Sequence, residues 1–171
     1  IEFNLRGNKV IGEDAAAQPI YKYLQTQDSG ALAAVTGLSL EWDVYTITVD
    51  GAVEGYDIAE SCGSQPLSLN PGVSLVTKLY MAPYTTHSLL VDVKGNGNPI
   101  ANATVTLSRG AFNQTTTTRS CGQAFFSGLS SGTVGGGNPY SLQVTAPGYT
   151  PYTSTAVDVS GTSRFSAALE P

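Results

Sequence analysis

Apolar and polar residues alternate along most of this chain, in short runs that turn residues separate. An alternation with a period of two is typical of a β-strand with one face in a core and one in water. It predicts seven strands, over residues 1–5, 45–49, 73–81, 89–93, 103–107, 140–146 and 165–169. Turn motifs such as Asn70-Pro71-Gly72 and Ala146-Pro147-Gly148 predict short connections between them.

Helical periodicity is absent from every segment of ten residues or more, and only Ala15–Ala17 and Ala31–Ala34 are expected to form a helical turn each. Thr115–Thr118 is rich in strand formers and is expected to be an exposed strand or hairpin arm. The Gly-rich segment Ser130–Asn138 is expected to be a mobile loop. The predicted fold class is therefore all β, built as antiparallel Greek-key β-sandwiches.

The chain also contains an approximate internal repeat. Residues 45–49 (YTITV) correspond to residues 140–144 (YSLQV), and the stretch Leu69–Pro83 corresponds to Val157–Pro171. The repeat predicts two tandem sandwiches, one over residues 1–84 and one over residues 85–171, joined near Pro83–His87.

The second unit carries a recognisable series of motifs: GNPIANATV at 97–105, CGQAFFSGL at 121–129 and YSLQVTAPGY at 140–149. These resemble the carboxypeptidase regulatory-like domain, a transthyretin-like sandwich, and the first unit resembles it more loosely. The resemblance implies a non-enzymatic domain that serves as a spacer or building block of extracellular proteins. Similar tandem modules in bacterial surface and pilus-related proteins suggest that setting for the parent protein.

Charged residues make up only 12 % of the chain, and the formal net charge is −5. No cluster of Lys or Arg exists, which excludes the electrostatic footprint of a nucleic-acid or anionic-membrane binder. No apolar stretch is long enough to span a bilayer. Because the chain starts at Ile1 without a signal-peptide pattern, it is expected to be a mature product or a piece of a longer protein.

Cys62 and Cys121 are the only cysteines, and one lies in each predicted unit. An even number of cysteines in an extracellular chain favours a disulfide, which here would link the two sandwiches and stabilise them by about 3–4 kcal/mol. The alternative is a pair of free thiols in a cytosolic protein. Two cysteines and His87 without close spacing do not form a zinc site, so no metal or cofactor is expected.

Glu41 and Asp43 flank Trp42, the only tryptophan. Two carboxylates beside an aromatic ring are compatible with a sugar-binding platform or a glycosidase pair. The favoured interpretation is that Trp42 packs in the first core and that the carboxylates are solvated. Tyr21 and Tyr23 are further candidates for binding a ligand.

Lys9 raises a different hypothesis. Some surface sandwiches that resemble this one, of the Cna-B type, form an isopeptide bond between a Lys on the first strand and an Asn or Asp on the last. Lys9 could supply the lysine, and Glu41 or Asp43 the acid that assists the reaction. The expected last strand of the first unit, however, has no Asn or Asp to accept the bond.

Other candidates are weaker. His87 lies at the predicted junction and has no catalytic motif around it, and Asp50, Glu54 and Asp57 are too dispersed for a good Ca²⁺ site. The sequence therefore predicts a structural module of an extracellular bacterial surface protein whose partners are other domains or subunits of the same assembly. The alternatives are a module that binds a glycan or a host surface, through Trp42, exposed tyrosines or the 130–138 loop, and an accessory domain of a peptidase.

Overall fold

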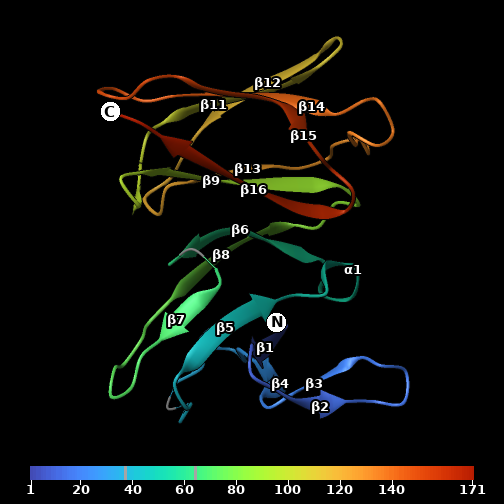
Figure 1. Ribbon diagram of the computed structural model, residues 1–171, viewed down its shortest axis with the longest axis vertical. Helices are drawn as coiled ribbons and strands as arrows, with labels where there is room; N and C mark the ends of the chain where they lie inside the picture. Colours follow the sequence, from blue (N-terminus) through green and yellow to red (C-terminus); the bar gives the residue numbers. More distant parts are fainter. Residues whose placement is uncertain (37, 64) are drawn as a thin grey trace.

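The computed structural model describes residues 1–36, 38–63 and 65–171, and its secondary structure is nearly all β (Figure 1). The N-terminal part is organised around an antiparallel sheet of four strands in the order β4-β1-β5-β7. These strands are β1 (Glu2–Gly7), β4 (Leu24–Asp28), β5 (Asp43–Thr48) and β7 (Leu67–Leu69).

Two hairpin-like pairs accompany this sheet. The first is the exposed pair of β2 (Val10–Glu13) and β3 (Pro19–Tyr21), and the second is the pair of β6 (Tyr56–Cys62) and β8 (Lys78–Pro83). A single helical turn, α1 (Gly51–Glu54), precedes β6 and is capped by the Asp50 carboxylate, which accepts hydrogen bonds from the amides of Ala52 and Val53.

The C-terminal part is a sandwich of two sheets. In one sheet, β9 pairs with three strands: β10, β13 and β16. The second sheet has the order β12-β11-β14-β15. The strands are β9 (Ser88–Gly95), β10 (Asn98–Pro99), β11 (Thr104–Arg109), β12 (Phe112–Thr117), β13 (Gln123–Phe126), β14 (Tyr140–Thr145), β15 (Tyr152–Val157) and β16 (Thr162–Leu169).

Alternation along the strands builds the core of this sandwich. Leu89, Val91 and Val93 of β9 point inward and meet Val105 and Leu107 of β11 in one large buried cluster. The N-terminal sheet has a smaller buried cluster of Leu5, Tyr45, Ile47 and Leu67.

The pair β6–β8 lies between the N-terminal sheet and the C-terminal sandwich (Figure 1). Leu79 of β8 packs on the N-terminal cluster, whereas the amide of Ser61 in β6 bonds to Gln123 in β13. Every residue of β6 from Asp57 to Ser61 is buried. Leu90 of β9, on the face opposite to Val91, is also buried, and β6 packs against β13 of the same sheet.

The predicted all-β class is confirmed, and so are strands over most of the seven runs and over Thr115–Thr117. Residues 73–77 form no strand, so the predicted run 73–81 is reduced to β8. Ala15–Ala17 and Ala31–Ala34 form no helix, and α1 was not predicted. β16 pairs parallel to β9, an exception to the predicted antiparallel order.

The predicted tandem repeat, with a boundary between residues 84 and 85, stays a prediction. The equivalent last strands of the two halves pair differently: β8 is antiparallel to β6, and β16 is parallel to β9. For description, residues 1–84 are called the N-terminal unit and residues 85–171 the C-terminal unit.

Candidate functional site

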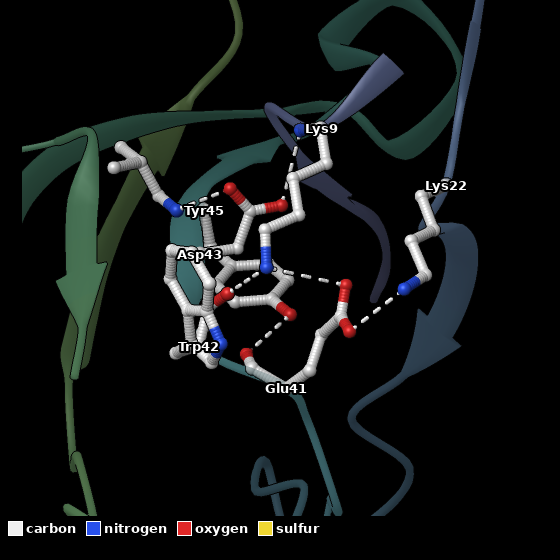
Figure 2. A network of polar contacts seen from close by, with 7 residues as sticks. Lys9, Lys22, Glu41, Trp42, Asp43 and Tyr45 are labelled. Carbon is white, nitrogen blue, oxygen red and sulfur yellow. Dashed lines mark hydrogen bonds and ion pairs between the residues drawn. The ribbon is translucent and has the colours of Figure 1, made fainter. Parts of the chain in front are cut away.

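The residues singled out around Trp42 do come together, where the chain after β1 passes the beginning of β5 (Figure 2). The ammonium group of Lys9 lies 3.5 Å from the centre of the Trp42 ring. It also donates a hydrogen bond to the Trp42 carbonyl and forms an ion pair with Glu41 at 3.4 Å. Lys9 thereby covers one face of the indole ring.

Glu41 is held by a second cation. Its carboxylate lies 2.9 Å from the ammonium group of Lys22. The hydrogen bond from Lys22 is the main reason that the pKa of Glu41 is lowered, and the charge of Lys9 adds to it. A carboxyl group with a lowered pKa stays ionised at neutral pH and is a poor proton donor.

Asp43 has a backbone role. One carboxylate oxygen accepts from the amide of Lys9 at 3.1 Å, and the other accepts from the amide of Val44 at 2.7 Å. Gly7 makes room for this arrangement, since a Cβ atom there would lie 2.5 Å from Asp43 Oδ2.

This geometry joins the segment after β1 to the beginning of β5. Hydrolysis of a glycoside by two carboxyl groups needs one of them protonated, and both Glu41 and Asp43 are engaged as hydrogen-bond acceptors. The favoured interpretation, that Trp42 packs in the first core, is wrong, because 60 % of the residue is exposed. Ligand binding by Trp42, Glu41 and Asp43 stays a prediction.

The two candidate tyrosines lie in different environments. Tyr23 packs edge-on against Tyr45, with ring centres 5.7 Å apart, and its hydroxyl donates to Gln25. Tyr21 instead stacks with the guanidinium of Arg6, whose central carbon lies 4.5 Å from the ring centre. Arg6 was not predicted as a site residue, because its alternation with Leu5 marks it only as a solvent-facing residue.

The predicted disulfide between Cys62 and Cys121 is present, and it links β6 to the segment before β13. Around it, the amide of Cys121 donates to Glu60 at 2.8 Å, and the amide of Ser61 donates to Gln123 at 2.7 Å. Glu60 and Gln123 are both almost fully buried. The bond therefore lies beside a buried polar layer between the two units.

The remaining candidates have structural contacts. The carbonyl of His87 accepts from the amide of Leu129, Asp50 caps α1, and Asp57 is buried and accepts from the hydroxyl of Thr162. Within the described ranges, no group of three metal-ligating side chains occurs. The loop over residues 130–138 is tied to the sandwich by a bridge between Gly132 and Val159.

Lys9 and Glu41, the residues of the isopeptide hypothesis, lie close together, but as an ion pair with partly exposed side chains. Asp43 accepts from the backbone amide of Lys9 rather than from its ammonium group. Formation of the cross-link stays a prediction, and an intact mass of the reduced protein tests it by a loss of water or ammonia.

Residues 89–170 match the family model of the carboxypeptidase regulatory-like domain. No curated protein matches the chain. A solved structure described as "The Bacillus anthracis TIE protein" is similar over 99 % of this chain and 34 % of its own, with 13 % sequence identity and a TM-score of 0.39. The chain thus spans about a third of that protein's length. Among the described residues, no helix is long and apolar enough to cross a membrane.

Proposed function

We propose, from the premise that residues 89–170 are a carboxypeptidase regulatory-like domain, that this chain is a non-enzymatic, rigid spacer of an extracellular assembly. The domain family is non-catalytic, and the motifs predicted from the sequence for residues 89–170 agree with it. The observation that carries the proposal is the connection between the two units, which is covalent at Cys62–Cys121 and hydrogen-bonded along β6.

The polar layer supports a fixed orientation of the units. Hydrogen bonds between buried partners have strict distance and angle requirements, and an unmatched buried donor costs about 1–3 kcal/mol. Three hydrogen bonds between described residues span the junction: Cys121 to Glu60, Ser61 to Gln123 and Thr162 to Asp57. A rotation of one unit against the other would break several of these contacts at once.

The disulfide indicates an oxidising compartment, and together with the domain family it indicates an extracellular or secreted location. We extend this to a bacterial surface protein, pilus-related or a surface stalk, in which neighbouring domains or subunits of the assembly are the partners. A surface with few charges and many hydroxyl groups suits such an exposed module.

Residual dipolar couplings test the rigidity that a spacer needs. Backbone amide couplings from residues 1–84 and from residues 85–171 of the oxidised protein are fitted separately to an alignment tensor. We expect the two tensors to agree in magnitude and direction, because one rigid body aligns as a whole.

The variant with Cys62→Ser and Cys121→Ser provides the comparison, since it lacks the covalent link and keeps the polar layer. The difference between its two tensors measures how much of the rigidity the polar layer supplies without the disulfide. Tensors of clearly different magnitude in the oxidised wild type would overturn the proposal, because they would mean a flexible hinge between the units.

A second candidate is a module that binds a glycan or a host surface, and the exposure of Trp42 favours it. An exposed indole ring can stack on a sugar. Binding to an array of glycans that Trp42→Ala abolishes and Tyr80→Ala leaves intact would support this function over a purely structural one. Tyr80 is the matched control because it is an exposed aromatic residue on β8.

A further inference from the structure

A polar groove lies on the outer face of the N-terminal sheet. Strand register places Arg6 opposite Leu24 and Thr46, and places Asn4 opposite Thr26 and Thr48. These side chains lie on the face opposite to Leu5 and Ile47, which are in the core. With Tyr21 from β3, they line a groove of about 320 Å³: Asn4, Arg6, Tyr21, Leu24, Thr46 and Thr48.

Arg6 is the unusual member of this groove. Its Nε atom is buried and has no hydrogen-bond acceptor, and within the described part of the chain no carboxylate forms an ion pair with its guanidinium. Lys9, Lys22 and Lys94 do have carboxylate partners. A buried donor without an acceptor is rare in native proteins, and an anion bound in the groove would supply an acceptor for Arg6.

The groove positions the guanidinium for such a partner. Stacking on Tyr21, at 4.5 Å from guanidinium carbon to ring centre, restricts the side chain and leaves the plane of its donors free to bond an anion. A carboxylate matches that plane with two parallel hydrogen bonds. Glu2 and Asp28 lie opposite each other farther along the same face, so a ligand with a single negative charge is favoured over a more highly charged one.

The other lining groups are neutral hydrogen-bonding groups with one apolar side chain. Asn4 Oδ1 already accepts from the hydroxyl of Thr26 at 2.9 Å, which leaves the amide N–H groups of Asn4 as donors. The hydroxyls of Thr46 and Thr48 can donate and accept, and Leu24 offers apolar surface that is 57 % exposed. A sugar ring, with hydroxyls at its rim and C–H groups on its faces, has this same mixture of groups.

We propose that this groove binds a carboxylated sugar of the uronic-acid class. Arg6 holds the carboxylate, Asn4, Thr46 and Thr48 hydrogen-bond to ring hydroxyls, and Tyr21 and Leu24 contact the C–H face. The site is separate from the exposed Trp42, and its function does not depend on the orientation of the two units.

Amide and arginine Nε–H resonances of the oxidised full chain, followed by NMR during titration with D-glucuronate, test the proposal. We expect saturable shifts of Arg6 Nε–H and of the amides of Asn4, Thr46 and Thr48. D-glucose, which lacks the carboxylate, is expected to bind at least tenfold more weakly, because a hydrogen bond to a charged group contributes more than a neutral one. Equal shifts with D-glucose, or shifts centred on Trp42, would overturn the proposal.

Variants separate recognition from folding. Arg6→Lys keeps the charge and loses the planar donor pair, and is expected to weaken glucuronate binding about tenfold or more. Thr48→Val, a change of an exposed residue with similar shape, is expected to weaken it a few-fold. Arg119→Lys, on the C-terminal unit, is the control and should leave the affinity unchanged. Unaltered affinity in both Arg6→Lys and Thr48→Val would place the binding elsewhere and refute the assignment. Failure of this experiment leaves the dipolar-coupling test of the spacer unaffected.

Discussion

At the scale of single residues, the charge state of Glu41 depends on two lysines, and on Lys22 more than on Lys9. We predict that Lys22→Met raises the pKa of Glu41 towards its ordinary value, because the hydrogen bond from Lys22 is the largest cause of the lowered pKa. Lys9→Met should raise it less. NMR titration of the Glu41 side-chain carboxyl carbon in the wild type and both variants measures the effect.

The sign of the linkage follows from the same shift. A carboxyl group with a lowered pKa in the folded state stabilises the protein above its unfolded pKa, and this contribution is lost as the pH falls through the folded value. Lys78→Met, which changes an exposed lysine without an ion pair among the described contacts, is the matched control. A larger rise in Lys9→Met than in Lys22→Met would contradict the prediction.

At the scale of elements, β6 depends on a partner from the other unit. Gln123 accepts from the amide of Ser61 at 2.7 Å, and its own amide donates to Asp92 at 3.4 Å. We predict that Gln123→Leu lowers the free energy of unfolding by about 1–3 kcal/mol, because it leaves a buried amide donor without an acceptor. Urea unfolding followed by circular dichroism measures this loss.

Gln143→Leu is the control for this change. Gln143 lies on β14 of the same unit and is exposed, so the same replacement should alter stability by no more than about 0.5 kcal/mol. If Gln123→Leu were as stable as the wild type, better apolar packing would outweigh the lost hydrogen bonds, as happens at some buried polar sites. The polar layer would then contribute nothing to the stability of the junction.

The strands that sequence predicted and those it missed differ in their surroundings. β9, β11 and β14 alternate in sequence because one set of their side chains fills the core of the sandwich. β6 is buried from Asp57 to Ser61 on both faces, so its sequence lacks the regular alternation that marks β9, β11 and β14. The run of residues 73–77 has a strand pattern but no neighbouring strand, and Val73, Leu75 and Val76 are exposed.

The candidate sites show the same limit. Cys62 and Cys121 could be paired from the sequence because a chain with two cysteines offers one pairing. The gathering of Lys9, Glu41 and Asp43 was considered from their positions along the chain, but the exposure of Trp42 was not foreseen. Prediction of the groove at Arg6 would require the register of β1 against both β4 and β5. It would also require the position of Tyr21 of β3, which lines the groove. Such register depends on contacts between distant segments, which a pattern of single residues does not specify.

At the scale of the whole molecule, the two units have cores of very different size. The C-terminal cluster extends over both sheets of a sandwich, whereas the N-terminal cluster consists of Leu5, Tyr45, Ile47 and Leu67 within the described residues. Since burial of apolar side chains is the main favourable term in folding, the N-terminal unit is expected to be the less stable one by itself. Its stability then depends on the disulfide and on the burial of β6 against the other unit.

We therefore predict that replacing both cysteines, by Cys62→Ser and Cys121→Ser, lowers stability by about 3–4 kcal/mol and separates the unfolding of the two units. Trp42, the only tryptophan, reports on the N-terminal unit by fluorescence, and circular dichroism reports on the whole chain. In the oxidised wild type, both signals should change at the same urea concentration; in the double variant, the Trp42 signal should change first. Coincident transitions in the double variant would mean that the polar layer alone couples the units, and that the disulfide adds stability without adding cooperativity.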